Sequence, residues 1–99
     1  MIATIVTYEP ANGKSAAEIV AGFHPTQSFF EGIPGLVRKY FCFDEAAMRG
    51  TSVYIWKDRA SADACLTSPE FLARFRKSFN CEPDIRYCDI KLVVDGKNV

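Results

Sequence analysis

Apolar residues alternate in strand-like patterns at four places along the chain and recur at helical spacing between them. The clearest stretch runs from Pro34 to Ala64, where Leu36 to Phe43 and Thr51 to Trp56 are dense in β-branched and aromatic residues. Asp44 to Gly50 between these two runs carries the turn signal. The pattern therefore predicts a β-hairpin that is followed by the start of a helix.

Both alternating faces of the two hairpin strands are largely apolar or aromatic. The first strand alternates Val37, Phe41 and Phe43 with Leu36, Tyr40 and Cys42, and the second alternates Val53 and Ile55 with Tyr54 and Trp56. A sheet with water on one side shows polar residues on that side. We therefore expect both faces of this sheet to be covered.

The first part of the chain predicts a strand and then an interrupted helix. Ile2 to Tyr8 is rich in β-branched residues and ends in a turn, so it indicates the first strand. Ser15 followed by Glu18 forms a capping box, which is typical of a helix start. Pro25 removes a backbone donor, so we expect a kink or a restart at His24 to Pro25, and Gly32 is placed as the glycine at the helix end.

The second part of the chain predicts two short helices and a last strand. Asp58 caps a helix that runs through Leu66, and Pro69 opens a further helix with an apolar stripe on one side. The last strand is expected from about Ile85 to Val94, followed by the polar tail 95–99.

This order of elements is strand, helix, strand, strand, helix, strand, the ferredoxin-like βαββαβ arrangement of the α+β class. In that fold both helical connections lie on one side of a four-stranded antiparallel sheet. Since the strands are apolar on both faces, the bare side needs a partner, and a second copy of the same sheet is the simplest one. We therefore predict that residues 1–99 form a single domain and that two copies of it form a homodimer.

Composition and charge exclude several classes of partner. Hydrophobic residues make up 48% of the chain and aromatic residues 13%, an excess that favours a second burial surface such as a pocket or a subunit contact. Twelve basic and twelve acidic residues cancel, so nucleic acid is not expected as a partner. No apolar run approaches the roughly 20 residues that span a bilayer, and the N-terminus does not resemble a signal peptide. We expect a cytoplasmic protein with no membrane contact.

The chain contains no sequence motif of a metal or cofactor site. The cysteines lie in apolar or strand-like surroundings without paired spacing, which favours free thiols over a disulfide framework; they are Cys42, Cys65, Cys81 and Cys88. Motifs of nucleotide-binding proteins, zinc proteases and serine hydrolases are absent. One histidine and unspaced cysteines argue against a metal site. We expect neither a metal nor another cofactor.

Three stretches resemble a known superfamily. They are PGLVRKYF after the first helix, GTSVYIWKDRASADA across the third strand and second helix, and SPEFLARF followed by PDIRYCDIKLVVD. With them the chain resembles the dimeric α/β-barrel superfamily, most closely its small monooxygenase branch, which is similar to the antibiotic-biosynthesis monooxygenases.

The resemblance implies a ferredoxin-like dimer with an apolar pocket in each subunit, between sheet and helices. Some relatives oxidise aromatic substrates there with O₂ and without metal or flavin, whereas others are isomerases or haem-degrading proteins. Trp56 is similar to the tryptophan that several oxygenase relatives place in that pocket. No histidine follows Trp56, so the haem-ligating arrangement is not matched.

Three residues are candidates for catalysis, each with a structural alternative. His24 is the only histidine, and histidine is the side chain best suited to proton transfer at neutral pH, but a histidine at a helix break can also be merely exposed. Tyr54 and Trp56 share a strand face, where they either line an aromatic pocket and offer hydrogen bonds or pack in the core.

Four further residues are candidates for substrate binding. Arg38 and Tyr40 share a face of the preceding strand, and the arginine either binds a phenolate or carboxylate or extends into solvent. Tyr8 is a further candidate with weaker support, as is Tyr87.

Two functions from different classes remain open. The first is a cofactor-independent monooxygenase in which the pocket binds a small electron-rich aromatic, a base such as His24 assists its deprotonation, and the anion reacts with O₂. The second is a small-ligand-binding or stress-related dimer that holds an apolar ligand without turning it over. The fold cannot decide between them.

Overall fold

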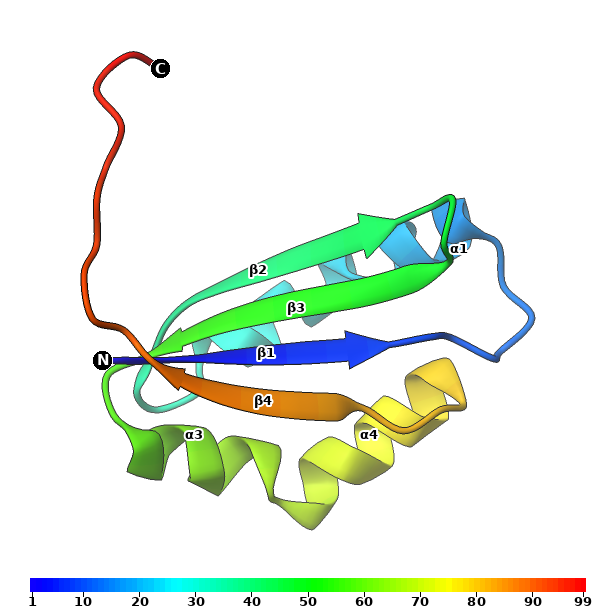
Figure 1. Ribbon diagram of the computed structural model, residues 1–99. Helices are drawn as coiled ribbons and strands as arrows, with labels where there is room; N and C mark the ends of the chain where they lie inside the picture. Colours follow the sequence, from blue (N-terminus) through cyan, green and yellow to red (C-terminus); the bar gives the residue numbers. More distant parts are fainter.

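Four antiparallel strands form one sheet, and the helices lie behind and below it in Figure 1. The computed structural model describes all residues, 1–99. The strands and helices, in chain order, are β1 (Ile2–Tyr8), α1 (Ala16–Ala21), the 3₁₀ helix η1 (His24–Thr26), α2 (Gln27–Glu31), β2 (Leu36–Asp44), β3 (Arg49–Trp56), α3 (Arg59–Leu66), α4 (Pro69–Phe79) and β4 (Asp84–Asp89).

The order of strands in the sheet is β2-β3-β1-β4, which confirms the ferredoxin-like α+β fold. Strand β1 is central and pairs antiparallel with both β3 and β4, so that Ile2 lies opposite Trp56 on one side and Asp89 on the other. Strands β2 and β3 form the hairpin at one edge.

Local capping signals set where the helices begin. Ser15 and Glu18 form the complete capping box before α1, each satisfying the backbone N–H of the other. The side chain of Asp58 accepts from the backbone N–H of Ser61 at the start of α3, and Ser68 caps α4 in the same way. The predicted helix break is also confirmed, because η1 separates α1 from α2.

The core lies between the helices and one face of the sheet. On that face Ile2, Val6 and Tyr8 of β1 and the aromatic pair of β3 are buried, and the helices cover them mainly with residues of α3 and α4. The opposite face, with Ile5 of β1 and Val53 of β3, carries no helix and is only half-buried. The expectation that both faces are covered is therefore met on one side of this chain only.

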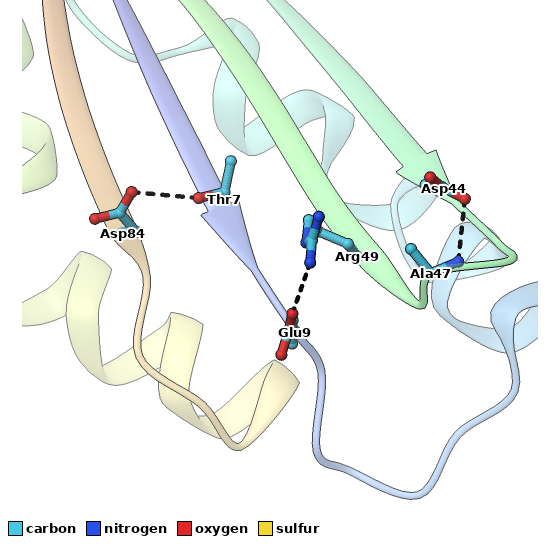
Figure 2. A network of polar contacts seen from close by, with 6 residues as sticks. All are labelled: Thr7, Glu9, Asp44, Ala47, Arg49 and Asp84. Carbon is cyan, nitrogen blue, oxygen red and sulfur yellow. Dashed lines mark hydrogen bonds and ion pairs between the residues drawn. The ribbon is translucent and has the colours of Figure 1, made fainter.

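Polar contacts tie the strands together at the hairpin end of the sheet (Figure 2). The Thr7 hydroxyl of β1 donates to Asp84 of β4 at 3.4 Å, and Arg49 of β3 forms an ion pair of 3.0 Å with Glu9. In the hairpin turn the Asp44 carboxylate accepts from the backbone N–H of Ala47 at 3.1 Å. All these groups are solvent-exposed or half-exposed, so they help to fix strand ends rather than supply a buried site.

Two sequence-based details are wrong. The last strand ends at Asp89 instead of continuing to Val94, because its partner β1 begins at Ile2 and only Met1, which accepts from the Ile90 N–H at 3.2 Å, lies beyond that pair. The segment 90–99 extends away from the body in Figure 1. Leu36 does not share a face with Tyr40 and Cys42, because a β-bulge between Leu36 and Arg38 shifts the alternation by one residue.

No helix in the structure has the length and apolar character needed to cross a membrane.

Candidate functional site

A cavity of about 210 Å³ opens between the α1–α2 segment and α4, with strands β1, β2 and β3 as its floor. Its walls are largely aromatic, and most of the chain's aromatic residues contribute to them: Tyr8, Phe23, Phe29, Phe30, Phe41, Tyr54, Phe71, Phe75 and Phe79. An apolar cavity of about 150 Å³ is known to hold benzene. The space here accordingly suits a ligand of one or two aromatic rings.

Polar and charged residues surround this aromatic interior. Lys14 and Glu18 come from the start of α1, and Arg74 comes from the exposed side of α4. The Arg74 guanidinium lies 3.8 Å from the ring centroid of Phe29 in α2, so a cation–π contact links the two helical walls. A polar rim around an apolar interior is typical of a ligand-binding pocket.

Lys39 is the one lysine that reaches the aromatic interior from the sheet. After the bulge at the start of β2, Lys39 alternates with Phe41 and Phe43 on the helix-facing side. Its Nζ atom lies 3.3 Å from the ring centroid of Phe30, 3.9 Å from that of Phe41 and 4.6 Å from that of Tyr54. The amine is therefore enclosed by three aromatic rings.

No carboxylate balances this amine. The five ion pairs of the chain involve solvent-accessible side chains, and none includes Lys39. Burial lowers the pKa of Lys39 to about 7, because a charged ammonium loses its hydration there; the nearby Cys65 opposes this shift. Lys39 is thus able to exchange a proton near neutral pH, which ordinary lysines cannot do.

Two tyrosines line the same cavity. Tyr54 of β3 and Tyr8 of β1 are both buried, and burial raises the pKa of each phenol well above its ordinary value. Both hydroxyls therefore keep their protons at neutral pH and act as hydrogen-bond donors. Gly50 lies opposite Tyr8 and makes room for it, since a Cβ at Gly50 would collide with the Tyr8 ring.

Trp56 lies beneath this site and does not line it. The indole is completely buried, and its Nε1–H donates to the Thr4 hydroxyl at 2.9 Å. Its ring stacks on that of Tyr54, with centroids 5.6 Å apart and planes at 8°. Trp56 therefore supports the position of Tyr54.

The sequence-based candidates divide into two groups. The structure brings Tyr8 and Tyr54 together in the cavity. It places His24 at the start of η1, exposed and outside the cavity lining. Arg38 and Tyr40 lie on the side of the sheet without helices, where the Arg38 guanidinium donates to the Tyr40 hydroxyl at 3.1 Å. His24, Arg38 and Tyr40 are therefore not part of the site that we propose.

Sequence reasoning missed Lys39, although a signal for it exists. Lys39, Phe41 and Phe43 are spaced two residues apart, so a lysine shares a strand face with two phenylalanines. A lysine on an apolar strand face is unusual unless it is paired or functional.

A second cavity of about 460 Å³ lies beside α2, α3 and the start of α4, and it is more open to solvent. Cys65 lines it, and burial raises the pKa of this thiol. No group of three or more His, Cys, Asp or Glu side chains lies close enough together to hold a metal ion.

Solved structures that are similar to this chain match it over almost its whole length. SnoaB, a cofactor-independent oxygenase from Streptomyces nogalater, aligns with a TM-score of 0.71 and 16% identity over 96% of this chain and 97% of its own. The chain shares the ferredoxin-like α+β fold of these structures. A monooxygenase from the gene ActVA-Orf6 of Streptomyces coelicolor, in complex with the ligand nanaomycin D, aligns with a TM-score of 0.72. It is 10% identical over 97% of this chain and 92% of its own.

A protein of unknown function from Nitrosomonas europaea aligns with a TM-score of 0.73 and 14% identity over 98% of this chain and 95% of its own. No model of a known family matches the sequence, and no curated protein is significantly similar to it. The ferredoxin-like fold that the resemblance implies is thus confirmed.

Proposed function

We propose that this protein is a cofactor-independent monooxygenase that oxidises a small electron-rich aromatic with O₂ in the 210 Å³ cavity. The observation that carries this proposal is the unpaired Lys39 amine, which lies among three aromatic rings and has a pKa of about 7. Two structural neighbours described as an oxygenase and a monooxygenase support the choice of reaction class.

The first step is a proton transfer from the substrate to Lys39. A phenol that stacks against the aromatic walls presents its hydroxyl to the neutral amine, which accepts the proton and becomes an ammonium ion. A phenolate and an ammonium attract each other strongly in an apolar site, so the pair is more stable there than a lone charge. Tyr54 or Tyr8 donates a hydrogen bond to the new oxyanion.

The anion then reacts with O₂ at an electron-rich ring carbon. A phenol with a free para position supplies all the electrons. One atom of O₂ forms a new C–O bond at the para carbon, which loses its hydrogen, and the other atom leaves as water with that hydrogen and the proton held by Lys39, so the products are a para-quinone and water. The aromatic walls position the ring and exclude water from the reactive anion. Trp56 contributes by holding the Tyr54 ring in place.

We also propose that two copies of the chain pair through the side of the sheet without helices. Ile5 of β1 and Val53 of β3 lie opposite each other at the centre of that side, and Tyr40 is 46% exposed at its edge. A stable dimer of this kind buries on the order of 1,600 Å².

Oxygen consumption against a panel of phenols and naphthols tests the proposed activity. We expect turnover with substrates of one or two rings, and a loss of about 10² to 10⁴ in rate for Lys39→Met, the typical effect of removing a positioned base. Lys77→Met is the matched control, because Lys77 is exposed on α4 away from the cavity lining. Binding of these phenols without oxygen consumption would refute the oxygenase and leave a ligand-binding dimer.

A further inference from the structure

The enclosed amine of Lys39 has the features of a nucleophile toward carbonyl carbon as well as those of a base. It has no carboxylate partner, and it lies in the lining of a cavity whose neighbouring walls are aromatic ring faces. Desolvation in a hydrophobic pocket is one way in which proteins activate lysine as a nucleophile toward carbonyl groups.

We propose that the cavity is also a carbonyl-binding site, in which the Lys39 amine condenses with a small aromatic aldehyde to form a Schiff base. The amine nitrogen attacks the aldehyde carbon and the carbonyl oxygen leaves as water with the two amine hydrogens, so a C=N bond replaces the C=O bond. No oxidant or reductant is consumed. The inference shares the cavity with the proposed oxygenase but does not depend on its reaction.

The tyrosines of the cavity assist this condensation. Loss of the carbonyl oxygen as water requires a proton donor, and the Tyr54 and Tyr8 hydroxyls keep their protons because burial raises the pKa of both phenols. The other titratable group near the amine is Cys65 of α3, whose pKa is also raised by burial. These three neighbours are therefore uncharged at neutral pH, and the apolar walls limit the return of water that would hydrolyse the imine.

The volume of the cavity predicts which aldehydes fit. About 210 Å³ is more than the roughly 150 Å³ that accommodates benzene, so one- and two-ring aldehydes enter and a three-ring aldehyde does not. The charges at the rim have both signs, Glu18 against Lys14 and Arg74, so they impose no requirement for a charged ligand.

Reductive trapping of the intact protein tests the proposal. The full chain is incubated without O₂ at pH 7 with benzaldehyde, 2-naphthaldehyde or 9-anthraldehyde, and sodium cyanoborohydride reduces any imine to a stable secondary amine. Peptide mass spectrometry then gives the rate of labelling at each lysine. At pH 7 about half of an amine with a pKa of 7 is unprotonated, compared with about 1 in 2,500 for an ordinary lysine.

We expect 2-naphthaldehyde to label Lys39 at least tenfold faster than the exposed Lys77, and 9-anthraldehyde to remove this preference. The Lys39→Met variant loses the fast adduct, whereas Lys77→Met keeps it. Equal labelling of Lys39 and Lys77, or equal preference with all three aldehydes, overturns the proposal in the unmodified protein, whatever the variants do. Because trapping is scored without O₂ or turnover, its failure is separate from a failure of the oxygen assay.

Discussion

Replacing Lys39 by methionine should stabilise the protein at neutral pH, and the gain should shrink as the pH rises. The side chains are of similar length, and a methionine sulfur packs well among aromatic rings such as Phe30 and Phe41. The lysine, in contrast, has its ordinary pKa of 10.5 in the unfolded chain and a pKa of about 7 in the folded chain. Folding near pH 8 thus requires Lys39 to release a proton.

The sign and size of the effect follow from this difference. Between pH 7 and 10.5 the unfolded state binds more protons than the folded state, so the contribution of Lys39 makes the free energy of unfolding rise with pH. One pKa unit corresponds to about 1.36 kcal/mol, and half of the folded-state amine is still protonated at pH 7, so the step from pH 7 to pH 9 adds about 2.3 kcal/mol. Lys39→Met lacks this contribution, while the shifted tyrosines are common to both proteins and cancel in the comparison.

Urea denaturation at pH 7, 8 and 9 measures the difference directly. The free energies of unfolding of parent and Lys39→Met should converge by about 2.3 kcal/mol over this range, with the variant the more stable protein at pH 7. Lys77→Met, at an exposed position of α4, should run parallel to the parent. Parallel curves for Lys39→Met would show that the three aromatic rings keep the amine charged, and the proposed base would then be refuted.

Three further predictions concern the support of the site and the bare side of the sheet. Gly50→Ala should lower the free energy of unfolding by about 1 to 3 kcal/mol, since the new methyl group meets the Tyr8 ring; an unchanged urea midpoint would contradict the close contact. Thr4→Val should cost about 1 to 3 kcal/mol by leaving the buried Trp56 indole N–H without an acceptor, and an unaltered melting curve would argue against that hydrogen bond. In sedimentation at micromolar concentration the parent should have twice the mass of one chain and Val53→Lys the mass of one; a monomeric parent would rule out the proposed dimer.

Local signals made most of the fold predictable from the sequence. The capping box of Ser15 and Glu18, the cap at Asp58 and the proline at Pro69 are each read from a few neighbouring residues, and the helices begin where these signals place them. The end of β4 was not predictable in this way. Its apolar residues continue past Asp89, but pairing depends on where the distant strand β1 begins.

The site was harder to predict because it depends on contacts between distant segments. The cavity exists because the α1–α2 segment and α4 stand apart above the sheet, which no local pattern records. Because of the bulge before Arg38, simple alternation from Leu36 assigns the following residues of β2 to the wrong faces of the sheet. His24 was a natural candidate as the only histidine, yet it lies exposed to solvent at the start of η1. The pKa of Lys39 is lowered by burial, which only the folded chain provides.

The single tryptophan gives this protein an internal optical reporter. Trp56 is wholly shielded from solvent, so its fluorescence should be emitted at short wavelength and resist quenching by iodide until the chain unfolds. Because the indole stacks on Tyr54, which in turn forms part of the cavity wall, a ligand that displaces the tyrosine ring should alter the emission without touching the tryptophan. Ligands for the cavity can therefore be screened by fluorescence titration of the unlabelled protein.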